Sequence, residues 1–152
     1  MTKKLDSEGL RSIVDEYDLF FIDIWGVVHN GIKLHGEAIK TLEEIERAKK
    51  DYVLLTNAPR PNATVKVFLE KMGMNKNMQK RVYTSGEASL NYLKKNHLDE
   101  TFYHIGPPRD FDLFLDFEKN KSKHIDESSY LLCTGLFEDK KNDLNYYKEL
   151  FK

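Results

Sequence analysis

The chain has 152 residues, about the size of one domain, since domains usually have ~100–200 residues. Hydrophobic residues make up 40% of it and charged residues 32%, a composition that indicates a globular protein and excludes a disordered or collagen-like chain. The 24 Lys and Arg nearly balance the 25 Asp and Glu, so the net charge of -1 argues against nucleic acid or an anionic membrane as a partner.

Cysteine content and apolar runs bear on the compartment. The single cysteine, Cys133, excludes an internal disulfide, and its apolar surroundings in the sequence predict a buried thiol. The apolar runs are far shorter than the ~18–20 residues that cross a bilayer, and the first residues are too polar for a secretion signal. We therefore expect a cytoplasmic protein.

The first part of the chain alternates helices with apolar strands, which is typical of an α/β fold with a parallel sheet. Residues 19–24 are apolar on both alternating faces, as in a strand that is buried on both sides. Asn30–Gly31 predicts a two-residue type I′ turn. In chain order, the expected elements are a helix over 7–16, a strand over 19–24, the turn at 30–31, a helix over 37–50, a strand over 52–57, a helix from Pro61 to about residue 73, a strand at 82–83 and a helix over 84–96.

The chain changes character after residue 98. Short apolar segments at 102–105 and 130–133 predict two strands, which are separated by a charged stretch that begins at Gly106-Pro107-Pro108. A last helix is expected from about Asp139. We therefore divide the chain into residues 1–98 and a separate layer or domain over 99–152.

Polar side chains follow the first two predicted strands where each ends. Asp23 is the one ionisable residue in an apolar strand, and Thr56 and Asn57 end the next strand. Ligands of open α/β sheets bind beyond the carboxyl ends of the strands, so these residues should converge there. A carboxylate in such a place is a candidate nucleophile or ligand of a hard cation. The alternative is a purely structural role, in which Asp23 caps a turn and Thr56 and Asn57 cap the next helix.

Two motifs carry a resemblance to a known family. They are Phe21-Ile22-Asp23-Ile24-Trp25-Gly26-Val27-Val28 and Leu54-Leu55-Thr56-Asn57. In this order they resemble motifs I and II of the haloacid dehalogenase superfamily, in particular of its NagD-like, C2-capped subfamily IIA. The resemblance implies part of a Rossmannoid three-layer sandwich core over residues 1–98 and part of a C2-type α/β cap over 99–152.

The same resemblance implies a Mg²⁺-dependent phosphatase of a small phosphorylated metabolite. Asp23 would be the nucleophile that forms an aspartyl-phosphate, and Asp23 with the backbone carbonyl of Trp25 would bind the metal. Thr56 and the backbone of Asn57 would hold the phosphoryl group. Arg60 follows the second motif and is a candidate substrate contact, with a solvated guanidinium as the alternative.

Two departures from the family pattern bear on activity. Trp25 stands where phosphatases of this superfamily usually have an Asp that acts as general acid and base, and His29 is a candidate substitute. The Lys and the acidic Gly-Asp motif that the family places after the cap are missing, so the chain resembles the N-terminal half of a longer protein. The partner would then be a second copy of the chain or a chain that supplies the other half of the core.

Two rival functions remain from the sequence. A catalytically inactive binding or assembly protein of the same fold is favoured by the missing motifs. A nucleotide-binding domain is disfavoured because no Gly-x-Gly-x-x-Gly follows either strand.

Overall fold

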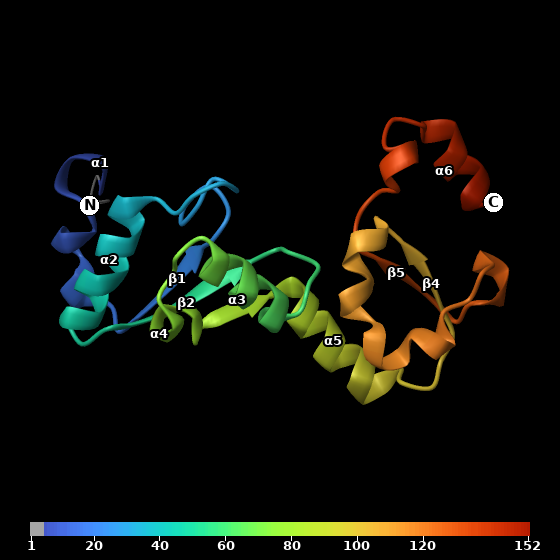
Figure 1. Ribbon diagram of the computed structural model, residues 1–152, viewed down its shortest axis with the longest axis horizontal. Coiled ribbons are helices and arrows are strands. Elements are labelled where there is room, and N and C mark those ends of the chain that lie inside the picture. Colours follow the sequence, from blue (N-terminus) through green and yellow to red (C-terminus); the bar gives the residue numbers. More distant parts are fainter. Residues whose placement is uncertain (1–4) are drawn as a thin grey trace. The chain divides into compact units, whose positions relative to one another are not determined.

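The computed structural model describes residues 5–152, which form two compact units (Figure 1). The first unit contains the chain up to Asn57 together with Asn62–Thr84. The second contains Ala58–Pro61 and Ser85–Lys152. The sequence-based domain division at residue 98 stays a prediction. In the structure, residues 85–98 and the short segment 58–61 group with the second unit.

The first unit is built on a three-stranded parallel sheet. Its strands are β1 (Leu19–Asp23), β2 (Asp51–Thr56) and β3 (Val82–Thr84), in the order β1-β2-β3. The register pairs Asp23 with Leu55 and Thr56 with Thr84, so all three strands end at the same edge. The expected strand-helix-strand unit with parallel strands is confirmed.

Helices α2 (Gly36–Arg47), α3 (Asn62–Lys71) and α4 (Lys76–Gln79) complete the first unit. Helix α2 contacts β2, and α3 contacts β3. The apolar side chains at helical spacing form the core with alternate side chains of the strands. The fully buried apolar side chains of this unit are Ile24, Val28, Leu42, Ile45, Tyr52, Leu54 and Leu69.

The N-terminal helix predicted over residues 7–16 is wrong as one element. The chain forms α1 (Leu5–Glu8), followed by two short 3₁₀ turns at Leu10–Ser12 and Val14–Glu16. Gly9 lies between α1 and the first of these turns, and its φ of 70° is outside the right-handed helical region, so the helix cannot continue through it.

The expectation that the first strand is buried on both faces is also wrong. Strand β1 lies at the edge of the sheet, and its side chains alternate between half-buried and exposed. Leu19 is 42% exposed and Phe21 is 67% exposed, so no described element covers the sheet face on which they lie. Apolar side chains on both faces of a strand are buried only where other layers pack on both sides of the sheet.

The turn after β1 differs from the predicted type I′ hairpin, which needs a positive φ at both central residues. Gly31 has a φ of 89°, but Asn30 does not have a positive φ. Instead, the Asn30 side chain accepts hydrogen bonds from the N–H groups of Ile32 and Lys33, both at 3.0 Å, and the chain closes through a bridge between His29 and Leu34. The asparagine therefore stabilises the turn through its side chain.

The main part of the second unit begins with α5 (Ser85–Asn96) and has a parallel pair of strands, β4 (Phe102–Ile105) and β5 (Tyr130–Cys133). Short 3₁₀ segments fill the connection between the strands, and α6 (Leu144–Leu150) lies near the end of the chain. The hydrophobic core packs around Phe102, which is fully buried against Phe114 and Phe117. Cys133 is exposed, contrary to expectation, because its side chain lies on the uncovered side of β5.

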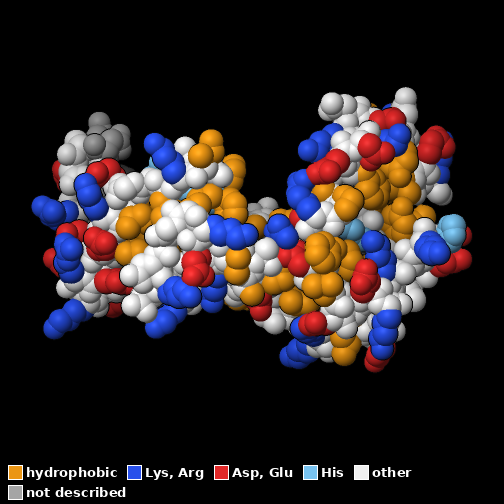
Figure 2. Space-filling model, viewed as in Figure 1, with side chains coloured by type: hydrophobic (Ala, Val, Ile, Leu, Met, Phe, Trp, Pro, Cys, Tyr) orange, Lys and Arg blue, Asp and Glu red, His pale blue; other side chains and the backbone are white. Residues whose placement is uncertain are grey.

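The surface mixes charges of both signs with exposed hydrophobic side chains (Figure 2). The helices of residues 5–152 are too short or too polar to span a bilayer.

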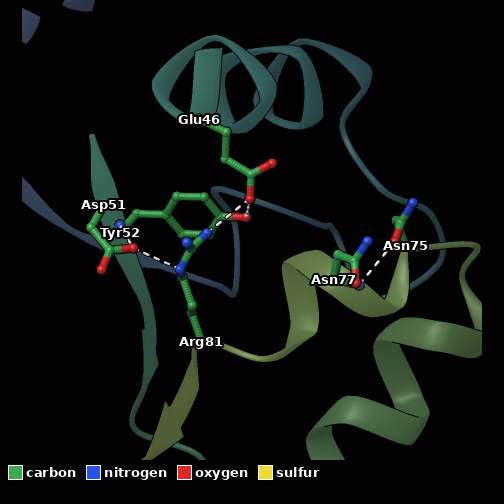
Figure 3. Close-up of polar contacts among 6 residues, drawn as sticks. All are labelled: Glu46, Asp51, Tyr52, Asn75, Asn77 and Arg81. Atoms are coloured by element: carbon green, nitrogen blue, oxygen red, sulfur yellow. Dashed lines mark hydrogen bonds and ion pairs between the residues drawn. The ribbon is translucent and has the colours of Figure 1, made fainter. Parts of the chain in front are cut away.

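A polar network ties α2, β2 and β3 together (Figure 3). The Arg81 guanidinium contacts the carboxylates of Glu46 at 2.8 Å and Asp51 at 2.6 Å, and it lies 4.8 Å above the ring of Tyr52. The buried Tyr52 hydroxyl donates to Glu46 at 3.1 Å. Burial, followed by the charge of Glu46, raises the pKa of Tyr52 to about 12, so the phenol remains a donor throughout the neutral range.

We expect Tyr52→Phe to lower the free energy of unfolding of the first unit by about 1 kcal/mol, because it removes one hydrogen bond to a carboxylate and keeps the ring under Arg81. The matched control is Tyr83→Phe at an exposed position, where the change should stay within about 0.5 kcal/mol. Urea denaturation followed by the fluorescence of Trp25, the single tryptophan of the chain, reports on this unit. Equal effects of the two variants would show that the hydrogen bond from Tyr52 to Glu46 adds no stability.

Candidate functional site

The candidate site lies at the carboxyl ends of β1 and β2. Asp23 ends β1 and pairs in register with Leu55, so the last residue of β2, Thr56, lies one position further along the neighbouring strand. Asn57 follows directly. The structure therefore brings three of the predicted site residues to one edge of one sheet.

Asp23 presents an exposed carboxylate at this edge. Its Oδ1 accepts a hydrogen bond from the N–H of Ile24 at 2.9 Å, which orients the carboxylate at the strand end. The same N–H of Ile24 also donates to the Leu55 carbonyl at 3.1 Å, so the hydrogen bonding between β1 and β2 continues past Asp23. Asp23 thus combines a fixed backbone with solvent access, which both a nucleophile and a metal ligand require.

Thr56 and Asn57 lead toward the start of α3. The first residue of α3, Asn62, accepts a hydrogen bond with its side chain from the N–H of Thr84 at 2.9 Å, which ties the helix start to the end of β3. This contact positions the N-terminus of α3 at the same edge of the sheet.

A short flap, residues 25–35, follows Asp23 and carries Trp25. The flap is closed by hydrogen bonds from the N–H of Gly26 to the His29 carbonyl and from the N–H of His35 to the Val28 carbonyl, both at 2.8 Å. The Trp25 side chain is 62% exposed, and its ring packs edge-on against His29 with 5.1 Å between centroids. An indole has no proton to transfer at neutral pH, so the Trp25 side chain cannot act as a general acid. The role of the Trp25 carbonyl as a metal ligand stays a prediction.

Gly31 has a role that the sequence did not reveal. A Cβ at this position would lie 2.5 Å from the Trp25 ring, so the glycine makes room for the indole as well as for the turn. The Asn30–Gly31 pair signals a turn, but the close approach of Trp25 depends on tertiary structure.

His29 is buried inside the flap, with 3% of its surface exposed. Its Nδ1 accepts a hydrogen bond from the N–H of Gly31 at 2.9 Å, and its ring also packs against Phe68. Burial, and secondarily the nearby His35, lowers the pKa of His29. A neutral, accepting ring is suited to holding the flap together and poorly suited to protonating a leaving group at neutral pH.

Arg60 lies in the second unit, whereas the other predicted site residues lie in the first. Its guanidinium makes a paired contact with Asp112, with Nη2 at 2.9 Å and Nε at 3.2 Å from Oδ2. The backbone around Arg60 is packed closely, because a Cβ on Gly86 would lie 2.3 Å from the Arg60 nitrogen. The predicted substrate contact of Arg60 stays a prediction, and Asp112 is the partner that sequence analysis missed.

The site has oxygen ligands of the kind that Mg²⁺ prefers, in the Asp23 carboxylate and the Trp25 carbonyl. Residues 5–152 contain no group of three or more acidic, histidine or cysteine side chains placed to hold a metal ion. The described residues therefore fit Mg²⁺ as two of its ligands, and water or further groups would have to complete the coordination.

Comparison with known proteins bears on this geometry. The family model for haloacid dehalogenase-like hydrolases matches residues 20–118, which include β2, the candidate site and all of β1 except Leu19. Phosphoglycolate phosphatase 2 of Arabidopsis thaliana is 25% identical over 95% of this chain and 53% of its own length.

Solved structures share the fold. A hydrolase of the haloacid dehalogenase-like family from Brucella suis is 30% identical and matches 93% of this chain and 51% of its own, with a TM-score of 0.78. A glycerol phosphate phosphatase from Mycobacterium tuberculosis, solved in complex with magnesium, is 18% identical and matches 91% of this chain and 42% of its own, with a TM-score of 0.63. The chain spans about half the length of these relatives.

The lowered pKa of His29 predicts a pH dependence of stability. Between the ordinary value of 6.5 and the lower folded value, the unfolded chain binds more protons than the folded one, so the free energy of unfolding should fall as the pH drops below about 6.5. We expect His29→Gln to flatten this slope between pH 7 and pH 5 in urea denaturation, while His124→Gln, at an exposed position, leaves it unchanged. If the free energy of unfolding falls equally steeply with pH in wild type and in His29→Gln, the lowered pKa of His29 is not the cause of the pH dependence.

Proposed function

The chain belongs to the haloacid dehalogenase-like hydrolase family, and from this premise we propose that it hydrolyses a small phosphorylated metabolite with Mg²⁺, using Asp23 as the nucleophile. The observation that carries the proposal is the exposed carboxylate of Asp23 at the end of β1, in register with β2 so that Thr56 follows on the neighbouring strand.

The proposed reaction has two steps. An Asp23 carboxylate oxygen attacks phosphorus, and a P–O bond forms while the bond to the leaving oxygen breaks and that oxygen takes up a proton from water. Water then hydrolyses the aspartyl-phosphate, which returns Asp23 and releases inorganic phosphate. The Thr56 hydroxyl and the Asn57 N–H would donate to the phosphoryl oxygens, which carry the charge of the transition state.

A magnesium ion would neutralise charge on the phosphoryl group, with Asp23 and the Trp25 carbonyl as its protein ligands. The mycobacterial structure with magnesium supports the choice of metal. Asp23 is the only carboxylate that we assign to the ion, so we expect weak binding by this chain alone.

The relatives support phosphate esters of small metabolites as the substrate class, since one is named for phosphoglycolate and another for glycerol phosphate. For Arg60 to contact such a substrate, its guanidinium would have to share or exchange its contact with Asp112. A cytoplasmic location is part of the same proposal and rests on the single cysteine, since a chain without disulfides fits a reducing compartment.

An inactive binding protein is the second candidate function, and Trp25 is the observation that favours it. General acid–base catalysis contributes ~10²–10⁴-fold, and neither Trp25 nor the buried, accepting ring of His29 is placed to supply it.

The direct test is hydrolysis of p-nitrophenyl phosphate by the full chain, with Mg²⁺ and with EDTA. We expect slow turnover that requires Mg²⁺ and disappears in Asp23→Asn, because the amide is neither a nucleophile nor an anionic ligand. Asp143→Asn is the matched control, since Asp143 caps α6 in the second unit and should not affect turnover. If wild type and Asp23→Asn are equally silent, the inactive protein becomes the better candidate.

Trp25→Asp tests the missing acid. The side chain is exposed, so the fold should accept the change, and a carboxyl at this place could protonate the leaving oxygen. We expect kcat for glycerol phosphate, whose alcohol leaving group must be protonated, to rise by at least ~10-fold, within the usual range for general acid catalysis. The rise must vanish in the double variant with Asp23→Asn, and Trp25→Asn should not reproduce it. An unchanged rate in Trp25→Asp would show that proton transfer is not what limits this chain.

A further inference from the structure

The flap, residues 25–35, exposes its largest apolar side chain beside the candidate nucleophile. Trp25 stands two positions after Asp23 and is 62% exposed, and two aliphatic side chains of the same flap, Val27 and Ile32, are also exposed. All of these residues lie in the first unit. Exposed apolar side chains that are scattered singly are common, but three in one short loop, next to a candidate site, indicate a surface that a ligand covers.

The Trp25 indole is held in place by its neighbours in the flap. Its six-membered ring lies over Gly31, where a Cβ would come within 2.5 Å of it, and the His29 ring packs against it at an angle of 87°. His29 is itself fixed, because its Nδ1 accepts from the Gly31 N–H and its ring also packs against Phe68. A ring that is already oriented loses little conformational freedom when a ligand packs on it.

The charges of the flap favour a neutral group over a cationic one as the ligand of this ring. A cation could also pack on an indole. It would find no carboxylate in the flap, however, since the only Lys, Arg, Asp or Glu among residues 25–35 is Lys33. A planar aromatic group needs no opposite charge and packs well on another aromatic ring.

Trp25 also lies within reach of the leaving group in the proposed reaction. The Cα atoms of Asp23 and Trp25 are at most ~7 Å apart, because a chain extends by ~3.3–3.6 Å per residue. In a displacement at phosphorus, the attacking and leaving oxygens lie roughly in line, so the leaving group points away from Asp23. A long, exposed side chain two residues beyond the nucleophile can contact a group on that side.

We propose that Trp25 determines which phosphate ester the site accepts, by packing its indole against an aromatic leaving group. The inference rests on the proposed function, because it places the ester at Asp23. It names the substrate class as a phosphate monoester whose alcohol or phenol part carries a planar aromatic ring. The side chain that has no proton to donate then contributes binding and selectivity in place of acid catalysis.

Phosphonates test this binding apart from turnover, because the proposed reaction does not cleave their P–C bond. The full chain with Mg²⁺ is titrated with phenylphosphonate and with methylphosphonate, and the fluorescence of Trp25, the single tryptophan, is followed. We expect a saturable change with phenylphosphonate that inorganic phosphate reverses, and no such change with methylphosphonate. Calorimetry should give phenylphosphonate an affinity at least ~5-fold higher, as expected for an aromatic pair.

Two variants test the ring itself. Trp25→Leu should remove the preference for phenylphosphonate over methylphosphonate, and Trp25→Phe, which keeps an aromatic ring, should retain it to within ~2-fold. Tyr92→Leu is the matched control, because Tyr92 is 60% exposed, nearly the same as Trp25, but lies in the second unit. Its preference should equal that of wild type. Circular dichroism of the free variants checks that each is folded.

The proposal is overturned if wild type binds both phosphonates equally well. It is also overturned if Trp25→Leu weakens both by the same factor, because Trp25 then only supports the flap. The proposed function survives either result, since the phosphonate group is still bound. If neither phosphonate binds, the site holds no phosphoryl group, and the proposed function fails together with this inference.

Discussion

The parallel pairing of β1 with β2 is the constraint on which the rest of the first unit depends. It sets Asp23 opposite Leu55, and so places a carboxylate beside the polar end of β2. A shift of the register by one residue would turn Asp23 to the helix-covered face and bring Phe20 and Ile22 out of the core. The apolar core opposes such a shift, because the fully buried side chains of β2, Tyr52 and Leu54, both lie on the helix-covered face of the sheet.

The polar network around Arg81 reinforces this pairing from the opposite end of the sheet. Its members come from α2, from the first residues of β2 and from the residue before β3, so one guanidinium joins three elements. The end of the sheet at which Asp23 lies, by comparison, has an exposed carboxylate and a short flap. The stabilising contacts of this network therefore lie at the end of the strands opposite the candidate site.

The flap shows how packing decides the chemistry available beside Asp23. The ring of His29 is used as an acceptor for the Gly31 N–H, and the Trp25 indole rests on that ring and over Gly31. These three residues form one interlocked group. A proton donor beside Asp23 would have to replace the indole, because the histidine already serves the turn.

Much of this protein could be predicted from the sequence. The order of strands and helices in the first unit followed from apolar periodicity, and the position of Asp23 and Thr56 at one sheet edge followed from parallel topology. The family followed from two short motifs and was confirmed by the match over residues 20–118. These features depend on local pattern and on connection rules, which a single sequence contains.

Tertiary structure decided the rest, because burial depends on which layers are present and a contact depends on residues distant in sequence. An apolar strand and an apolar cysteine segment looked buried, yet Phe21 and Cys133 are exposed where no described element covers their faces. Arg60 looked free to meet a substrate, but Asp112, 52 residues away, holds its guanidinium. The sequence by itself determined the fold class and the candidate nucleophile, and only the tertiary structure showed which side chains near it are already engaged and which face of the sheet is open.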